Sequence, residues 1–252
     1  MSYLLYCVFR SLPQPEPEVL TGVDRQPVWV MDHCGLGAGI SELRESDPLP
    51  DVARVLAYES VVESFFNRRT IIPMRYGCVV RDRPELAAVL DKYRKECDAL
   101  LHRLEGLAEM GIQVPVELSE AGAEIDSAAI PAARFHGSNR SGASYLLAKK
   151  LHYGSADRNV ERQNELVKTV CRPLAGLFVD RKVELPSSGT PLLALHFLVP
   201  RASVEAFRAA SRHAFQNESA KFLVSGPWAP YNFAAFSDVA GSPKQPGSRP
   251  RR

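Results

Sequence analysis

Residues 49–118 read LPDVARVLAYESVVESFFNRRTIIPMRYGCVVRDRPELAAVLDKYRKECDALLHRLEGLAEMGIQVPVEL, and three local patterns follow one another within them without a linker. From Asp51 to Asn67, apolar residues recur at helical spacing, which predicts an amphipathic helix. Thr70 to Val80 is rich in β-branched and apolar residues, which predicts a buried strand. Pro73 within that strand predicts a sheet edge or a bulge, because proline has no N–H for the ladder. The apolar side of the helix comprises Val52, Val55, Leu56, Val62, Phe65 and Phe66.

A second long helix is predicted from Pro84 to Ala108. Asp82 and Glu85 have capping-box spacing, and Pro84 lies in the first turn, where its missing N–H is tolerated. Apolar residues then recur in steps of four and three, which is typical of a helix with one continuous packing seam. The seam packs internally or receives a helix of another protein, and we favour internal packing. We expect the helix to stop at Gly111. The seam comprises Leu86, Leu90, Tyr93, Cys97, Leu100, Leu104 and Leu107.

The flanking sequence predicts an α+β chain with two domains and a tail. Strands are expected at 3–9 and 28–31, so residues 1–110 form an N-terminal α/β domain with a small mixed sheet and two long helices. Residues 111–237 form the second domain, with strands expected at 112–118, 178–185, 192–199 and 220–224 and helices at 143–174 and 203–215. Their order, β-α-β-β-α-β, is that of a ferredoxin-like domain. Residues 238–252 are rich in Pro, Gly, Ser and Arg and are expected to be a disordered tail.

Composition indicates an ordinary globular protein. The 252 residues are 45% hydrophobic and 24% charged, and the net charge of +2 gives no electrostatic case for a nucleic-acid or membrane partner. No apolar run approaches the roughly 18 residues of a membrane span, and the first residues lack the basic start of a signal peptide. The five cysteines include no CxxC pair, so we expect reduced thiols in a cytoplasmic protein.

The sequence contains no arrangement typical of a catalytic centre. The glycine run at 35–39 lacks the third glycine of a dinucleotide fingerprint, since that position is Ile40, so a surface loop is favoured over a phosphate-binding loop. Asp32, His33 and Cys34 are adjacent, but neighbours on a strand point to opposite faces, so no metal site is expected. Cys78 and Cys97 would be reactive only beside a cation, and burial is favoured. We therefore predict no catalytic residue, cofactor or metal.

The opening stretch also resembles the signature region of the gas vesicle protein GvpF/GvpL family. The matching pieces are LPDVARVLAYESVVE, IIPMRYGCVVRD, a long charged helix and GIQVPVEL, followed by SGASYLLAKK (141–150) and SGPWAPYNF (225–233). Their order and spacing fit over most of residues 1–236. Tyr76 replaces a usual Phe, and Ala229 stands where Pro is common. The resemblance implies a ferredoxin-like C-terminal domain beside a distinct N-terminal α/β domain, and its motifs are shared by GvpF and GvpL.

This resemblance implies a function that the residues alone do not name. Members are accessory or minor structural proteins of gas vesicles, the hollow protein shells that give buoyancy, so the cytoplasm and the vesicle are the implied locations. The implied partners are the small hydrophobic shell protein GvpA and other gas vesicle accessory proteins, with GvpA kept from aggregating during assembly. An apolar subunit with open strand edges is an aggregation hazard until it is covered. The alternative is an enzyme of ferredoxin-like fold acting on a small molecule or nucleotide; it rests on the glycine run and Arg75 alone, and we predict no enzyme.

Two surfaces are candidates for binding the shell protein. Arg75 interrupts an apolar strand, as edge strands do to discourage wrong pairing; it lies at the rim of a partner groove or pairs with Asp82 or Glu63, and pairing is favoured. The aromatic run near the C-terminus is an exposed anchor or packs between the domains, and packing is favoured. The first surface comprises Ile71, Met74, Arg75 and Tyr76. The alternative surface comprises Trp228, Tyr231 and Phe233.

Overall fold

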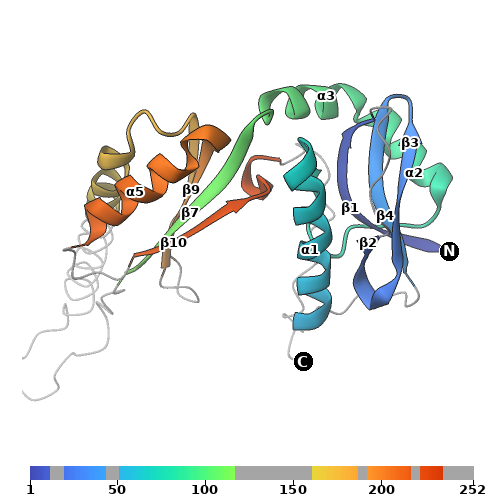
Figure 1. Cartoon of the computed structure of the whole chain (residues 1–252), viewed down its shortest axis with the longest axis horizontal. Coiled ribbons are helices and arrows are strands. Elements are labelled where there is room, and N and C mark those ends of the chain that lie inside the picture. Colours follow the sequence, from blue (N-terminus) through green and yellow to red (C-terminus); the bar gives the residue numbers. More distant parts are fainter. Residues whose placement is uncertain (12–19, 44–50, 117–160, 187–191, 217–221, 235–252) are drawn as a thin grey trace, which may run out of the picture. The chain divides into compact units, whose positions relative to one another are not determined.

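The structure is a computed structural model that describes residues 1–11, 20–43, 51–116, 161–186, 192–216 and 222–234 (Figure 1). The first elements are β1 (Ser2–Arg10), β2 (Leu20–Thr21), β3 (Pro27–His33), β4 (Leu36–Leu43), α1 (Val52–Arg68), β5 (Ile72–Pro73) and β6 (Val79–Val80). They are followed by α2 (Arg83–Lys92), α3 (Arg94–Arg103), β7 (Leu107–Pro115), β8 (Asp180–Glu184), β9 (Leu192–Pro200), α5 (Val204–Phe215) and β10 (Leu223–Trp228). Residues 161–171 are also helical. No helix among these residues is both long and apolar enough to span a membrane.

The first sheet has the strand order β2-β3-β4-β1-β5, and β6 pairs with β1 as well. The pairs of β1 with β4, β5 and β6, of β2 with β3 and of β3 with β4 are all antiparallel, so the expected mixed sheet is wrong. The strand expected at 70–80 is two short strands, β5 and β6, on the same side of β1. Pro73 lies in β5, the outermost strand on this side, which confirms the predicted sheet edge.

The glycine run at 35–39 is neither a surface loop nor a phosphate-binding loop, because most of it belongs to β4. This strand is buried and pairs with both β1 and β3. A Cβ on Gly39 would lie 2.9 Å from the Phe65 ring, and one on Gly37 would clash with the ring of Phe9. These two rings stack with their centroids 5.3 Å apart. Glycine is required here because two aromatic rings from other elements lie against the strand.

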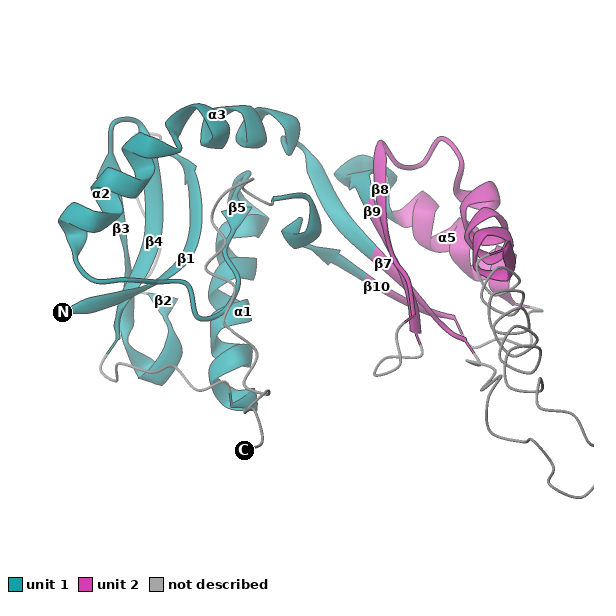
Figure 2. Cartoon of the chain, turned by 180° about the vertical axis from the view of Figure 1, so that it is seen from behind, with its two compact units in different colours: residues 1–110, 198–204, 226–252 teal, residues 111–197, 205–225 magenta. Residues whose placement is uncertain are grey.

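Strand β1 is buried on both faces (Figures 1 and 2). On one face Tyr6 stacks on Tyr58 of α1, with ring centroids 4.7 Å apart. On the other, Tyr3, Leu5 and Val8 share a core with buried residues of α2 and α3. The pairing register with β4 shifts between Leu5 and Cys7, and this bulge puts Val8 on the face of Tyr3 and Leu5 despite the odd spacing. A continuous apolar run is thereby buried between two helical layers.

Helix α1 begins as predicted. The Asp51 side chain caps it by accepting a hydrogen bond from Arg54 N at 2.8 Å. The second predicted helix, 84–108, is wrong in its length, because α2 and α3 meet at a kink at Tyr93 (φ −104°, ψ 17°). Helical hydrogen bonds continue through the kink, from Tyr93 N to Val89 O and from Cys97 N to Tyr93 O. No proline or glycine lies at the kink, and Leu90 and Cys97 on either side of it are both buried in the core shared with β1.

The predicted seam on these helices packs internally. Leu86, Leu90, Cys97 and Leu104 are all buried in the core that they share with β1, which confirms the favoured interpretation. The expected stop at Gly111 is wrong, because β7 begins at Leu107 and Gly111 lies inside it. A Cβ on Gly111 would lie 2.7 Å from Ser225 Oγ, so this glycine permits close packing within a sheet.

The second sheet has the strand order β10-β7-β9-β8. Strands β8 and β9 and helix α5 occupy their predicted places, and β10 begins three residues later than the strand expected at 220–224. Of the described part of the helix predicted at 143–174, residues 161–171 are helical, and Arg172–Leu174 form a 3-10 turn instead. The rest of that helix and the tail predicted at 238–252 lie outside the described residues.

The chain divides into two compact units (Figure 2). Of the described residues, the first unit holds those within 1–110, 198–204 and 226–234, and the second holds those within 111–197 and 205–225. Strands β7, β9 and β10 therefore each belong partly to both units. That residues 1–110 and 111–237 fold as independent domains stays a prediction.

A buried hydroxyl joins α1 to two segments of the first sheet. Tyr58 Oη lies 2.8 Å from the carbonyl oxygen of Leu5 in β1 and 2.8 Å from that of Met74, which follows β5. The residue is fully buried, and burial raises its pKa well above the ordinary value, so the hydroxyl keeps its proton and donates. Tyr58 therefore fixes where the chain leaves β5.

We expect Tyr58→Phe to lower the free energy of unfolding by about 1–3 kcal/mol, because it leaves buried carbonyl oxygens without their donor. Urea denaturation measures the difference. Tyr3→Phe is the matched control, since no described residue forms a hydrogen bond with the Tyr3 hydroxyl. Equal midpoints for Tyr58→Phe and the unchanged protein would show that this hydroxyl does not hold the segments together.

Candidate functional site

The turn at Arg75, Tyr76 and Gly77 projects from the edge of the first sheet between β5 and β6. Before the turn, Met74 N donates to Tyr6 O at 2.9 Å, and after it Leu5 N donates to Cys78 O at 2.9 Å. Both anchors lie on consecutive residues of β1, so the three residues between them form an excursion from the ladder. Gly77 has φ +89°, a conformation that glycine adopts without strain.

The four residues predicted at this edge do not share one environment. Arg75 is exposed and Met74 and Tyr76 are half-buried, whereas Ile71 is 1% exposed and belongs to the core. Ile71 is therefore unsuited to contact a partner, because its side chain is already covered. The turn keeps one cation and two partly apolar side chains at the surface, and their role in binding stays a prediction.

Tyr76 connects the turn to the start of α1. Its ring stands edge-on to Tyr58, with centroids 5.4 Å apart, and its hydroxyl is buried without a hydrogen-bond partner among the described residues. Burial raises the pKa of Tyr76; the nearby Arg54 lowers it, and Asp24 and Asp51 raise it. The hydroxyl thus stays protonated beside one cation and two carboxylates.

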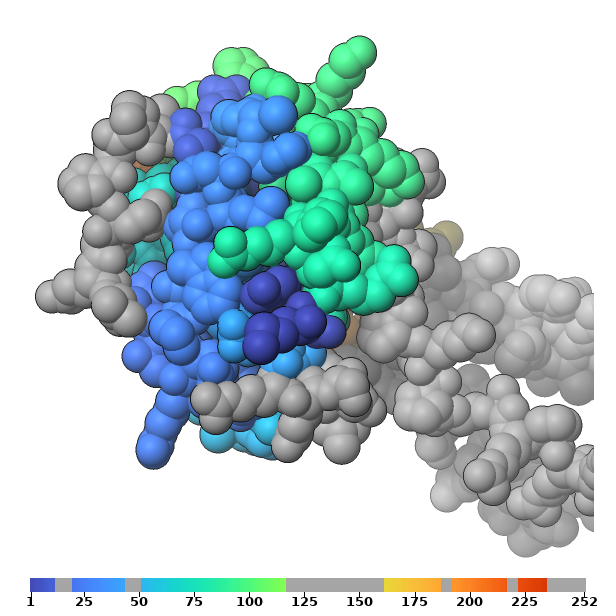
Figure 3. Space-filling model, turned by 90° about the vertical axis from the view of Figure 1, so that its right-hand side faces the viewer, coloured from blue at the N-terminus to red at the C-terminus, as the bar shows by residue number. Residues whose placement is uncertain are grey.

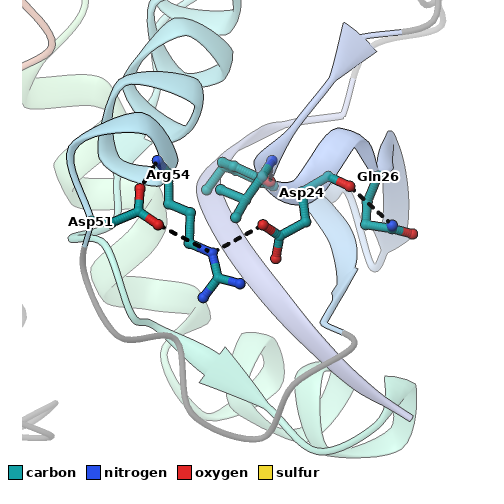
Figure 4. A network of polar contacts seen from close by, with 6 residues as sticks. Asp24, Gln26, Asp51 and Arg54 are labelled. Carbon is teal, nitrogen blue, oxygen red and sulfur yellow. Dashed lines mark hydrogen bonds and ion pairs between the residues drawn. The ribbon is translucent and has the colours of Figure 1, made fainter.

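Arg54 is held between two carboxylates at the start of α1 (Figure 4). Its Nε lies 2.9 Å from Asp24 Oδ1 and 3.7 Å from Asp51 Oδ2. Asp24 lies in a left-handed conformation (φ 53°), and Gln26 Nε2 donates to its carbonyl oxygen at 3.3 Å. This network joins the loop before β3 to the helix, and it fixes the neighbourhood of Tyr76.

The favoured pairing of Arg75 with Asp82 or Glu63 is wrong. No ion pair of Arg75 occurs within the described part of the chain. Asp82 instead caps α2 by accepting from Glu85 N at 2.8 Å, as its capping-box spacing predicted. The exposed Arg75 guanidinium is therefore available to a partner.

An exposed apolar pair lies on α1. The helical spacing predicts Val52 and Leu56 on the apolar side of the helix, yet they are 77% and 64% exposed. The other half of the stripe, including Val62 and Phe65, is buried as predicted. Val52 and Leu56 lie one turn apart and thus share a face of the helix. Arg54, Val55 and Tyr58 of the same turns are at least half-buried, so Val52 and Leu56 lie on the side of α1 that faces away from the core.

The aromatic run near the C-terminus divides into two roles. Trp228 is 51% exposed at the end of β10, whereas Phe233 is buried in the core that β1 shares with α2 and α3. Tyr231 Oη lies 3.1 Å from Glu59 Oε2 of α1. Tyr231, Phe233 and Glu59 all lie within the first unit, so the run packs on residues of the N-terminal half and is not an exposed anchor as a whole.

Asn232 adds two hydrogen bonds that hold the same run of residues in the first unit. Its backbone N and its side-chain Nδ2 donate to the buried carboxylate of Glu109, at 2.9 and 2.6 Å. Two donors to one carboxylate offset the cost of burying its charge. The end of the motif SGPWAPYNF therefore packs in the first unit. Of the three aromatic residues in this motif, only Trp228 is exposed enough to anchor a partner.

Cys78 and Cys97 are not reactive thiols, and the adjacent residues Asp32, His33 and Cys34 do not point to one place. Burial raises the pKa of Cys78, and burial with the charges of Asp98 and Glu96 raises that of Cys97 to about 11, so both are protonated and unreactive at neutral pH. Asp32 turns away from its neighbours and accepts a hydrogen bond from Ser11 Oγ. His33 and Cys34 instead lie beside Asp91, which comes from α2.

A pH-dependent stability is expected from Glu59. Burial raises its pKa, the hydrogen bond from Tyr231 lowers it, and the charge of Glu63 raises it. The folded protein then binds more protons than the unfolded chain just above the ordinary pKa, so stability falls as pH rises through that window. We expect Glu59→Gln, which keeps an acceptor for Tyr231, to gain stability relative to the unchanged protein between about pH 4 and 7.

Urea midpoints across that pH range test this expectation. Glu105→Gln, at an exposed position of the same unit, is the matched control and should leave the pH dependence unchanged. A constant difference between Glu59→Gln and the unchanged protein at every pH would contradict the raised pKa of Glu59.

Comparison with known proteins shows to which family the chain belongs. A family model described as "Gas vesicle synthesis protein GvpL/GvpF" matches residues 2–235. Gas vesicle protein L of Streptomyces sp. (strain CB03234) is 26% identical over 255 residues, which cover 93% of each protein. Gas vesicle protein F of the same organism is 27% identical over 239 residues, covering 92% of this chain and 99% of that protein.

Solved structures share the fold. The crystal structure of GvpF from Microcystis aeruginosa superposes with a TM-score of 0.72 at 18% identity, covering 93% of this chain and 99% of that one. GvpF from Anabaena sp. PCC7120 gives a TM-score of 0.69 at 21% identity, covering 94% and 99%. The sequence resemblance is thereby confirmed across the chain, and the protein belongs to the GvpL/GvpF family of gas vesicle proteins.

Proposed function

We propose that this protein supports gas vesicle assembly in the cytoplasm by binding the shell protein GvpA and keeping it from aggregating. The observation that carries the proposal is the turn at the edge of the first sheet, where Arg75 is exposed and unpaired among the described residues and Met74 and Tyr76 flank it. Membership in a family of gas vesicle proteins supplies the class of partner. Other accessory proteins of the vesicle are further proposed partners.

The sheet edge supports this placement because it offers two kinds of contact. Strands β5 and β6 contribute two residues each, so the ladder beside β1 is interrupted at the turn. An interrupted edge admits a short extended segment and discourages continuous pairing with an unintended strand. A shell subunit with open strand edges would be covered by such a contact before it is incorporated.

Charge and apolar surface support the placement further. Arg75 would pair with an acidic residue of the partner, while Met74 and Tyr76 would contact apolar side chains next to it. Arg54 is already held by Asp24 and Asp51, so it does not compete for that acidic residue (Figure 4). The exposed pair Val52 and Leu56 on α1 provides additional apolar area on the same unit.

The second sheet fits the ferredoxin-like arrangement that we infer for it. In a ferredoxin-like domain the four strands lie in the order 4-1-3-2, and the order β10-β7-β9-β8 corresponds to this when β7 is counted as the first strand. The helix at 161–171 precedes β8, and α5 lies between β9 and β10, as the β-α-β-β-α-β order requires.

A pull-down with GvpA tests the binding surface. We expect Arg75→Glu to weaken capture by on the order of 1–3 kcal/mol, because it replaces a charge-assisted contact with repulsion. Arg68→Glu, with the same charge change at an exposed position of α1, is the matched control and should bind like the unchanged protein. Circular dichroism confirms beforehand that each variant folds.

Trp228→Ala tests the alternative surface in the same assay. Normal capture by Arg75→Glu together with loss of capture by Trp228→Ala would move the site to the aromatic run. Equal loss in Arg75→Glu and Arg68→Glu would indicate a general charge effect instead of a defined surface. Absence of capture by the unchanged protein would contradict GvpA as the partner.

A further inference from the structure

The tip of the β3–β4 hairpin holds a cysteine in an unusual conformation. Cys34 and Gly35 form the two-residue turn, with φ +50° and +84°, and His33 pairs with Leu36 across it. Positive φ at both positions matches a type I′ turn, in which Asn or Gly is usual at the first position. A cysteine at this position is uncommon, and it places an exposed thiol next to His33.

Asp91 joins these two residues from the last turn of α2. His33 Nε2, Cys34 Sγ and an Asp91 carboxylate oxygen all lie within 4.8 Å of one another. Nε2 lies 2.9 Å from Asp91 Oδ1, yet the approach lacks hydrogen-bond geometry, so Nε2 is a buried atom with no hydrogen-bond partner among the described residues. Figure 3 shows the blue β3–β4 region beside the green helices α2 and α3 on this face of the first unit.

We infer that His33, Cys34 and Asp91 form a binding site for a divalent ion of the Zn²⁺ class. Imidazole nitrogen, thiolate sulfur and carboxylate oxygen are the donors that Zn²⁺ takes in proteins, at about 2.0–2.3 Å. Around one tetrahedral ion such donors would lie about 3.3–3.6 Å apart, which the observed cluster reaches with small side-chain rotations. The fourth position faces solvent, because Cys34 and Asp91 are exposed.

Charge at the site favours this class of ion. The thiolate and the carboxylate together balance a divalent cation, and Mg²⁺ and Ca²⁺ are disfavoured because they require oxygen ligands. The competing arrangement is a plain ion pair of protonated His33 with Asp91, in which Cys34 takes no part.

Titration of the full-length reduced protein with Co²⁺ distinguishes the two arrangements. We expect saturation near one equivalent, visible d–d bands of a four-coordinate ion, and a near-ultraviolet charge-transfer band that reports thiolate ligation. Addition of Zn²⁺ should abolish these bands and raise the melting temperature. Cys34→Ser should lose the charge-transfer band, and Asp91→Asn should bind at least about 10-fold more weakly.

Asp32→Asn is the matched control, because Asp32 is adjacent to His33 but turns toward Ser11, and it should bind Co²⁺ like the unchanged protein. A charge-transfer band that persists in Cys34→Ser would place the metal on another thiol and overturn the assignment. Absence of the band in the unchanged protein, or equal affinity in Asp91→Asn, would also overturn it and leave the ion pair as the role of this cluster.

Discussion

The burial of β1 on both faces is the constraint on which the first unit depends. One face of this strand packs on α1 through Tyr6 and Tyr58, and the other packs on α2 and α3 through Tyr3, Leu5 and Val8. A strand with no solvent-facing side must satisfy its backbone on both edges, and it does so with β4 on one side and with β5 and β6 on the other. The exposed turn at Arg75 exists because β1 holds both of its ends.

The sequence predicted those helices and strands that are determined by residues next to one another in the chain. Asp51 and Asp82 cap their helices at the places that their spacing indicated, since a cap needs only the next three residues. The strands β8 and β9 and the helix α5 followed from periodicity alone. The glycines of β4 did not, because Gly37 and Gly39 exist to admit Phe9 and Phe65, and no pattern within the run records those rings. The kink at Tyr93 likewise has no proline or glycine to mark it in the sequence.

The candidate site was predicted only in part, for the same reason. The sequence predicted an interrupted strand with an arginine in it, but the burial of Ile71 and the exposure of Val52 and Leu56 depend on which side of each element packs on the core. Asp91 joins His33 and Cys34 only because α2 folds back beside the β3–β4 hairpin. The aromatic run was a clear motif, yet its partners Glu59 and Glu109 lie far from it in sequence.

The return of the chain to its first unit has a consequence for biosynthesis. Tyr231, Asn232 and Phe233 complete a core whose other members lie almost entirely within the first 110 residues. During translation these closing residues are made after the residues of the second unit. The nascent N-terminal half therefore lacks part of its core until residues 231–233 have been made. Completion of the first unit depends on residues that follow the second unit, so a chain truncated before Tyr231 would be left unfinished in its N-terminal core, far in sequence from the truncation.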